Sequence, residues 1–340
     1  MTTIQDVART AGVGVGTVSR VLNDSPFVSD ETRRRVQLVI DEMAYHPSSL
    51  ARALSLGRSA SLAVIVPHFT RPSTMERLRG LADAVNGTEF DLVLFDVENL
   101  DQRDRRFAMA GRSDRAAGVV IVSLGAPDDL VEQLAKASVP VVFLDRHVEG
   151  LPNVHIDDRE GGRVATEHLL SLGHRRIAFV GDDDALGFGF TSSDDRRSGY
   201  RSALEAAGVS VDERYMRVGP SSRQAAHRLT DELLEMQDPP TAVFAASDLQ
   251  ALGVVEAARE RGLDVPGGLS VMGFDDIDAA VYLGLTTVSQ PLFDSGRLAA
   301  EMLLAALAGE EVPSGIELPI ELVIRKTTGP VGQTRMKPTS

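Results

Sequence analysis

Residues 14–23 combine small polar side chains with one arginine at a spacing that suits contact with double-stranded DNA. A helix that begins near Gly14 or Val15 would expose six of them. They are Val15, Gly16, Thr17, Ser19, Arg20 and Asn23. A guanidinium can donate in a fork to O6 and N7 of guanine, small hydroxyls reach phosphates, and the amides at a helix N-terminus favour an anion. These residues therefore fit a helix in the major groove. A solvated helix in a structural three-helix module is the alternative.

Three short helices with tight turns are expected over residues 3–46 to position this segment. Apolar residues recur at helical spacing before and after a break at Gly12. The two sets are Ile4, Val7, Ala8, Ala11 and Val15, Val18, Val21, Leu22. Two helices joined by so tight a turn predict a helix-turn-helix. A third helix should begin after Ser29, whose hydroxyl can cap it, and Pro47 closes the module.

The composition is that of a globular protein with more than one domain. The chain has 340 residues, 43% of them hydrophobic, no cysteine and a net charge of −14. Residues 1–58 hold seven arginines and six acidic side chains, a balance of +1, so the remaining 282 residues carry −15. Without cysteine, disulfide scaffolds, thiolate metal sites and cysteine nucleophiles are excluded. No apolar run suits a membrane span and residues 1–12 do not resemble an export signal, so we expect a cytoplasmic protein without a membrane partner.

From Leu62 onward, short apolar runs alternate with amphipathic stretches. The runs occupy residues 62–66, 91–95, 118–122, 140–144, 176–180, 242–246 and 269–273. Such runs are typical of buried parallel strands in βαβ units. The sequence predicts an α/β fold with two doubly wound parallel-sheet subdomains, which divide near residues 157–162 after about four strands. A helix over 295–307 and a late strand over 316–324, able to join either sheet, follow.

Motifs of enzymes and metal sites do not assemble in this sequence. The acidic string at 182–184 lacks the spacing of a calcium loop and suggests a solvated loop. The histidines form no zinc-binding pair, and His174, just before a strand, suggests a structural hydrogen bond. The glycines at 187 and 189 fit neither a dinucleotide motif nor a phosphate loop, and no nucleophile elbow occurs. We therefore predict a protein that is not an enzyme and has no cofactor and no metal.

The segments TIQDVARTAGVGVGTVSRVLN and VSDETRRRVQLVIDEMAYHPSSLARAL resemble the lactose/galactose repressor family of bacterial transcription regulators. Later segments agree in the same order, among them EHLLSLGHRRIAFVGD, RRSGYRSALEAAG and PPTAVFAASDLQALGVVEAARERGLDVPGGLSVMGFDDI. The resemblance covers nearly the whole chain.

This resemblance implies an organisation and a set of DNA contacts. A headpiece (1–46) and a hinge helix with linker (47–58) precede an effector-binding and dimerisation domain (59–330) and a flexible tail (331–340). Base readout falls on Val15, Gly16 and Arg20, and phosphate contacts fall on Thr3, Thr17, Ser19, Asn23 and Thr32. In the hinge, Leu54, with Ala51 one turn earlier, would wedge into the minor groove at a central C-G step. Gly14 departs from the usual serine, which puts one phosphate contact in doubt. Paired hinges imply a homodimer on a pseudo-palindrome.

The α/β part resembles periplasmic sugar-binding proteins, whose ligand lies between two subdomains. The resemblance implies an N-subdomain of 59–157 and 291–317, a C-subdomain of 161–289 and 321–330, and crossings near 157–160, 289–291 and 317–321. Ligands of such sheets lie beyond the carboxyl ends of the strands. The side chains expected there are Phe69, Ser73, Asp145, Phe188, Phe190, Arg196, Ser247 and Asp275. Carboxylates, a guanidinium opening a helix at Arg196, and aromatic faces suit a sugar. Helix capping, surface charge and loop core are the alternatives.

The expected function is a sequence-specific repressor of carbohydrate-metabolism genes whose operator affinity is set by a small effector, most simply a sugar. A regulator of the same fold with a nucleobase or nucleoside corepressor is the first alternative, and induction and corepression both stay open. A solute-binding protein would explain the cleft without the headpiece. A sugar-modifying enzyme would need Asp145 and Asp275 as an acid–base pair. Dimerisation is expected through the helices that follow the first strand, Asp248 and Asp276.

Overall fold

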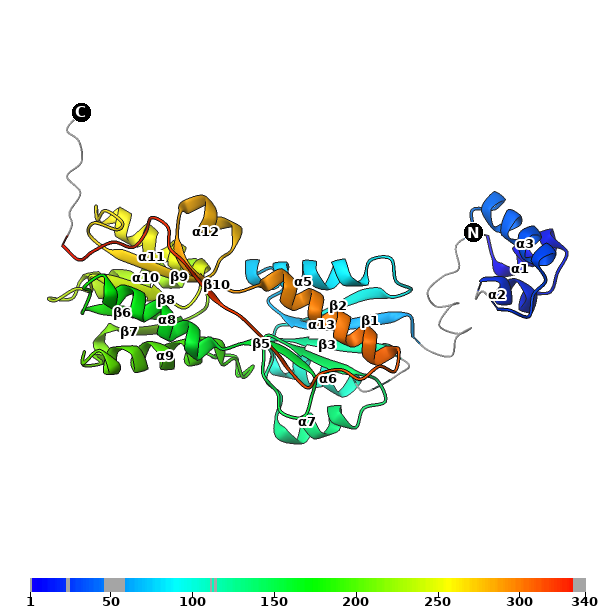
Figure 1. Ribbon diagram of the computed structural model, residues 1–340, viewed down its shortest axis with the longest axis horizontal. Coiled ribbons are helices and arrows are strands. Elements are labelled where there is room, and N and C mark those ends of the chain that lie inside the picture. The colour runs from blue at the N-terminus through cyan, green and yellow to red at the C-terminus, as the bar shows by residue number, and fades with distance from the viewer. Residues whose placement is uncertain (1, 23–24, 46–58, 111, 113–114, 333–340) are drawn as a thin grey trace, which may run out of the picture.

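The computed structural model describes residues 2–22, 25–45, 59–110, 112 and 115–332 (Figure 1). Its first three helices are α1 (Ile4–Ala11), α2 (Val15–Leu22) and α3 (Asp30–Glu42). Apolar side chains from all three, including Val7, Val18 and Val36, form one small core. The predicted cap of the third helix is confirmed, because the Ser29 side chain accepts a hydrogen bond from the Thr32 amide. This small core fixes which side of α2 stays exposed.

The first α/β unit, here called the N-subdomain, is built on a six-stranded sheet in the order β11-β5-β4-β3-β1-β2, and all of its pairs are parallel. The strands are β1 (Ser61–Pro67), β2 (Asp91–Val97), β3 (Gly118–Val122), β4 (Val141–Leu144), β5 (Asn153–Ile156) and β11 (Ile316–Leu318). Helices α5 (Pro72–Val85) and α13 (Leu292–Leu307) cover one face. Helices α6 (Leu100–Ala110) and α7 (Asp128–Ala135) lie on the other (Figure 1).

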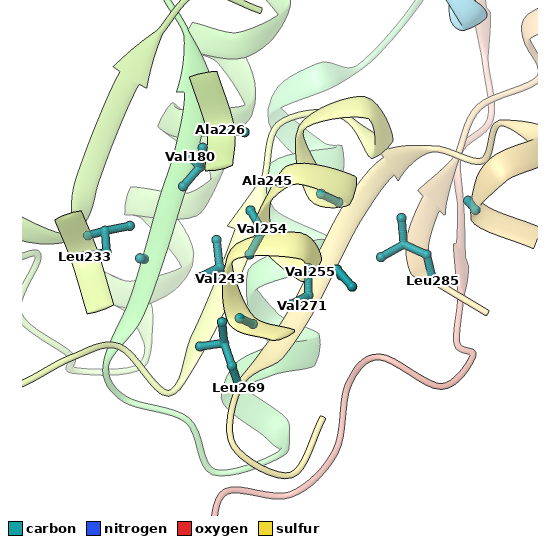
Figure 2. Packing of buried hydrophobic residues seen from close by; sticks show 14 of the residues in the cluster. Val180, Ala226, Leu233, Val243, Ala245, Val254, Val255, Leu269, Val271 and Leu285 are labelled. Atoms are coloured by element: carbon teal, nitrogen blue, oxygen red, sulfur yellow. The ribbon is translucent and has the colours of Figure 1, made fainter. Parts of the chain in front are cut away.

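The second unit, the C-subdomain, has a sheet in the order β12-β10-β9-β8-β6-β7. Its strands are β6 (Ile177–Asp182), β7 (Met216–Gly219), β8 (Ala242–Ala245), β9 (Ser270–Asp275), β10 (Thr286–Ser289) and β12 (Glu321–Val323). Its helices are α8 (Asp158–Ser171), α9 (Ser192–Ala206), η1 (Glu213–Tyr215), α10 (Arg223–Leu234), α11 (Asp248–Glu260) and α12 (Asp278–Leu283). Figure 2 shows how Val243 and Val271 of the sheet pack against Val254 and Val255 of α11.

The chain passes between the two sheets three times. It leaves β5 for α8, returns from β10 to α13 through Gln290 and Pro291, and leaves β11 for β12. The expectation of one strand over 316–324 is therefore wrong. Pro319 has no N–H to donate to a ladder and separates β11 in the first sheet from β12, which pairs antiparallel with β10 in the second. Five strands, not about four, precede the first crossing, because the short β5 is added.

Two glycines allow helices to pack closely beside Arg77 and Arg196, which line the pocket described below. A Cβ on Gly162 of α8 would lie 2.0 Å from the backbone oxygen of Arg196 on α9. A Cβ on Gly296 of α13 would lie 1.9 Å from the backbone oxygen of Arg77 on α5. Any side chain at either glycine would force the helices apart. The two contacts therefore fix the backbones that carry Arg77 and Arg196.

Candidate functional site

A pocket opens between the two subdomains at the carboxyl ends of their strands. The N-subdomain supplies residues that follow β1, β3 and β4, and the C-subdomain supplies residues that follow β6, β8 and β9. The lining residues are Pro67, Arg71, Pro72, Ser73, Thr74, Arg77, Ser123, Asp145, Asp182, Phe190, Ser192, Arg196, Ser221, Ala246, Ser247, Leu249, Asp275, Ile277 and Gln290. Most of these are polar and can donate or accept hydrogen bonds.

A chain of polar contacts joins the two walls of this pocket. The Arg77 guanidinium donates to Asp145, whose other carboxylate oxygen accepts from the Ser123 hydroxyl at 2.7 Å. Arg77 Nη2 also donates to Gln290 Oε1 at 2.9 Å. Gln290 Nε2 in turn donates to Asp275 Oδ1 at 2.6 Å. Gln290 lies on the crossing between β10 and α13, so its amide connects an N-subdomain cation to a C-subdomain carboxylate.

Arg196 is held by contacts on several sides. Its Nε donates to Asp158 Oδ1 at 2.7 Å and its Nη1 donates to the Ala246 carbonyl at 2.5 Å. Its Nη1 lies 3.7 Å from Asp275 Oδ1, and its Cζ lies 3.6 Å from the centre of the Phe274 ring. A guanidinium fixed in this way presents a preorganised fork to a ligand. The ring beneath it adds a cation–π contact.

Burial makes the carboxylates of this region weaker acids than usual. Burial raises the pKa of Asp158 to about 6, against the opposing charge of Arg196. Burial likewise raises the pKa of Asp275, although Arg196 and Arg77 oppose it. Burial and then the neighbouring charge of Asp275 raise the pKa of Asp248 to about 8. Perturbed acids of this kind gather at functional clefts because such clefts bury charge.

Strained backbone occurs at the strand ends that carry the polar side chains. Ser123, Asp145 and Asp275 have φ values of 58°, 64° and 116°. Non-glycine residues rarely adopt positive φ, which costs about 1–3 kcal/mol per residue. These residues follow or end β3, β4 and β9, so the strain marks the pocket.

The structure brings together six of the eight residues predicted for effector binding. Ser73, Asp145, Phe190, Arg196, Ser247 and Asp275 all line the pocket. Ser247 also caps α11, because its hydroxyl accepts from the Gln250 amide at 3.3 Å. Arg196 does not open its helix as expected. Helix α9 begins at Ser192, since the serines and acids at 192–195 suit a first turn.

The two remaining residues lie away from the pocket wall. Phe69 is 41% exposed and is not among the lining residues. Phe188 is fully buried in the N-subdomain core beside Phe107 and Phe143, so for this residue the alternative of a core side chain is correct.

Several pocket residues were not predicted from the sequence. Arg71 and Arg77 were missed because an arginine at the start or in the middle of a helix looks like surface charge. Gln290 precedes Pro291 at a crossing, and neutral polar side chains give no periodic signal. Asp182 belongs to the acidic string predicted as a solvated loop, and that prediction is wrong for it. Asp182 lines the pocket, and burial raises its pKa.

One other prediction from a single residue can be compared with the structure. His174 is buried and has the structural role expected. Its Nδ1 lies 2.9 Å from the Thr241 hydroxyl, and its Nε2 lies 3.0 Å from the Gly329 carbonyl. Within the residues that the structure describes, no group of three or more potential ligands is arranged to hold a metal ion. No helix in the same part of the chain is long and apolar enough to cross a membrane.

The first three helices leave the predicted DNA-reading side of α2 open. Val15, Gly16 and Arg20 are exposed, while Val18 and Val21 are buried. Gly16 and Arg20 are one turn apart and share a face. The Thr3 hydroxyl caps the N-terminus of α1 in a capping box with Asp6. A phosphate contact by Thr3 would therefore use a hydroxyl that already serves as a helix cap.

The remaining predicted DNA contacts fall into two groups. Thr17, Ser19 and Thr32 are partly buried. Asn23, Ala51, Leu54 and the whole hinge at 47–58 lie outside the described residues.

A three-helix headpiece in which α2 keeps an exposed face, followed by two sheets around a polar pocket, is typical of a DNA-binding regulator with a ligand-binding type of domain. Comparison with known proteins agrees. Residues 3–48 match the bacterial regulatory proteins of the lacI family, and residues 166–328 match a periplasmic binding protein-like domain.

The chain is 32% identical to catabolite control protein A of Priestia megaterium over 96% of its length and 99% of that protein. It also resembles the solved cellobiose complex of the transcriptional regulator CelR at 33% identity and a TM-score of 0.70, over 96% of this chain and all (100%) of that one. A lac repressor dimer bound to operator and the anti-inducer ONPF matches at 27% identity and a TM-score of 0.84, over 96% and 99% of the two chains.

The chain belongs to the lacI family of bacterial regulatory proteins. The resemblance seen in the sequence and the predicted fold class are thereby confirmed. The family consists of transcriptional regulators, not enzymes.

Proposed function

We propose that this regulator represses carbohydrate-metabolism genes and that a small sugar, bound in the interdomain pocket, sets its affinity for operator DNA. The observation that carries the proposal is the polar chain from Asp145 through Arg77 and Gln290 to Asp275, with Arg196 beside it. Paired carboxylates accept from vicinal hydroxyls, and guanidinium forks donate to them. The solved CelR complex holds cellobiose, which supports a sugar for this chain as well.

The pocket favours a sugar over a nucleobase. A flat base gains affinity by stacking on aromatic faces, whereas a sugar is held mainly through its hydroxyls. Phe190 is the one aromatic residue among the pocket lining within the described chain. Phe188, the other candidate of the same loop, is buried in the core. Charged and hydroxyl groups therefore dominate recognition.

We further propose that the protein acts as a homodimer on a pseudo-palindromic operator. The lac repressor that it resembles is a dimer on its operator. In this chain, Met75 of α5 and Val281 and Tyr282 of α12 are apolar side chains at 44%, 59% and 90% exposure, on two of the helices expected at the interface. The proposed base contacts are Val15, Gly16 and Arg20. Because the target is chromosomal DNA, we place the protein in the cytoplasm.

The test is selection of random duplex DNA by the full-length protein at fixed moderate salt. One arm contains no ligand, a second contains a pool of mono- and disaccharides, and a third contains nucleobases and nucleosides. We expect enrichment of a palindrome centred on a C-G step, and we expect the sugar pool to change that enrichment. Fixed salt matters because phosphate contacts make affinity strongly salt-dependent.

The other outcomes separate the alternatives. A palindrome that only the nucleobase arm creates or abolishes would replace the sugar by a nucleobase effector. A palindrome indifferent to both pools would overturn the assignment of the pocket to either class. Absence of enrichment in all three arms would contradict the DNA-binding proposal.

A further inference from the structure

The loop between β6 and α9 crosses from one subdomain to the other. It starts from Asp182 at the end of β6 in the C-subdomain and returns to α9 at Ser192. Within it, Phe188 is fully buried in the core of the N-subdomain, together with Ile65, Leu124 and Phe143. A C-subdomain loop thus places an aromatic ring inside the partner subdomain. We call residues 183–190 the interdomain loop.

Hydrogen bonds to three backbone carbonyls of this loop hold it against the N-subdomain. The Gly125 amide, after β3, donates to the Phe188 carbonyl at 2.8 Å. Arg146, after β4, donates to the Gly189 carbonyl, and Arg103 of α6 donates to the Gly187 carbonyl at 3.3 Å. Each of these donors belongs to the N-subdomain. The docking therefore combines a buried ring with three hydrogen bonds across the subdomain boundary.

The loop is also shaped from within. Asp184 Oδ1 accepts from the Phe188 amide at 2.8 Å, and Asp184 Oδ2 accepts from the Gly189 amide at 2.7 Å. Gly189 has a φ of 74°, and a Cβ on Gly125 would come within 3.0 Å of Gly189 Cα. Two facing glycines thus let the backbones touch. The geometry requires glycine at both places.

The docking point is separate from the covalent crossings. Two of the three crossings leave the first sheet from β5 and β11, at one edge. The interdomain loop docks beyond β1 and β3, next to His68 and Gly125, on the other side of β4. A contact placed away from the hinges restrains rotation about them.

We propose that the interdomain loop is a latch in which docked Phe188 holds the two subdomains at one closure angle. The Phe188 ring meets the pocket-lining Phe190 ring edge to face, with centroids 5.5 Å apart. The latch therefore also sets the position of Phe190 on the pocket wall. Its regulatory consequence rests on the proposed function, since an effector changes operator affinity only if it distinguishes between closure angles.

The test measures the distance between the subdomains in the full-length protein, without DNA and without effector. The chain has no cysteine, so Asp129→Cys on α7 and Glu205→Cys on α9, both exposed, take spin labels at these two places alone. Pulsed dipolar spectroscopy on labelled protein diluted with unlabelled protein reports distances within one chain. We expect a narrow distribution with Phe188, and a broader one with a longer component after Phe188→Ala.

The matched control is Phe107→Ala. Phe107 is 1% exposed in the same core, but α6 of the N-subdomain carries it. The Phe107→Ala variant loses a comparable amount of packing and should keep the narrow distance distribution. Asp184→Ala, which loosens the loop without emptying the core, should broaden the distribution and serves if Phe188→Ala does not fold. An unchanged distribution in both loop variants, or equal broadening in Phe107→Ala, would overturn the latch. Neither outcome depends on whether the pocket binds sugar.

Discussion

Replacing Gln290 by glutamate should lower the stability of the folded protein by an amount that depends on pH. Gln290 is 6% exposed, accepts from Arg77 at 2.9 Å and donates to Asp275 at 2.6 Å. Gln290→Glu keeps the size of the side chain and the bond from Arg77. An ionised Glu cannot donate to Asp275, however, and would place a second negative charge next to a buried one. We therefore expect the folded variant to hold a shared proton between the two carboxyl groups.

The cost of that proton sets the magnitude. A free Glu has a pKa of about 4.3, so keeping one carboxyl protonated costs about 1.4 kcal/mol for each pH unit above that value. The cost is about 1 kcal/mol at pH 5 and has an upper limit of about 4 kcal/mol at pH 7. Arg77 and Arg196 lie beside the pair and favour the charged form, so we expect a loss of about 2–3 kcal/mol at pH 7.

The sign follows from proton linkage. The pKa of the introduced carboxyl is higher in the folded state than in the unfolded state, so the unfolded state loses its proton first as the pH rises. Stability relative to wild type is then retained below about pH 4 and falls as the pH rises toward the folded pKa. The wild-type amide has no such proton. The difference between the two proteins therefore reports the titration of the carboxyl pair at positions 275 and 290 and removes that of distant groups.

The assay is urea unfolding followed by circular dichroism at several values between pH 5 and pH 7. Gln290→Met is the control. It removes both hydrogen bonds without adding charge, at a cost of about 1–3 kcal/mol for each polar group left unpaired. The amide hydrogen bond that is lost lowers the pKa of Asp275 in the wild type, so the deficit of Gln290→Met should also grow with pH, but less steeply than that of Gln290→Glu. A constant deficit in Gln290→Glu, or an equal slope in both variants, would refute the reasoning.

Three further predictions concern DNA binding and a buried ion pair. Arg20→Ala should weaken binding to the selected palindrome by about 1–3 kcal/mol and relax the preference at one base pair per half-site, as measured on a panel of mutated sites. Equal loss on every sequence would show a phosphate contact instead. Leu54→Ala, in the hinge, should reduce specific binding and DNA bending together in gel-shift and bending assays, and unchanged bending would exclude the wedge. Asp158→Asn should gain about 3 kcal/mol relative to wild type as the pH rises from 4 to 7, because a pKa of about 6 means that ionising Asp158 costs folded stability. A wild-type protein that gains on the variant over this range in urea unfolding would show that the ion pair with Arg196 prevails.

The sequence predicted strands well where they are apolar and central. Runs such as residues 118–122 and 242–246 became β3 and β8 because every residue in them is buried. The missed strands β5, β7 and β10 are short and contain polar residues such as Asn153, Arg217 and Thr287. Their pairing depends on neighbouring strands, which a local pattern does not reveal.

The pocket shows the same division between local and non-local information. Asp145 and Asp275 were predicted because they end apolar strands, where the fold places ligands. Arg77 and Gln290 were not, because they are 213 positions apart in the chain and meet only through the crossing at β10 and α13. Phe188 has a local sequence typical of an exposed loop. Its burial depends on the other subdomain, so no periodicity could show it.

The charged side chains of the pocket that make no ion pair indicate how an effector can distinguish closure angles. Arg77 is paired with Asp145, and Arg196 with Asp158. Within the described chain, the Arg71 guanidinium makes no such ion pair, although Asp182 and Asp275 attract it from the opposite wall. A hydrogen bond to a charged group contributes about 1.5–3 kcal/mol. Two such bonds made at only one closure angle thus supply about 3–6 kcal/mol, and about 5.5 kcal/mol shifts a two-state equilibrium from 1:99 to 99:1. A ligand whose hydroxyls reach both Arg71 and Asp182 at only one closure angle would therefore shift the equilibrium between closure angles against the restraint of the latch at Phe188.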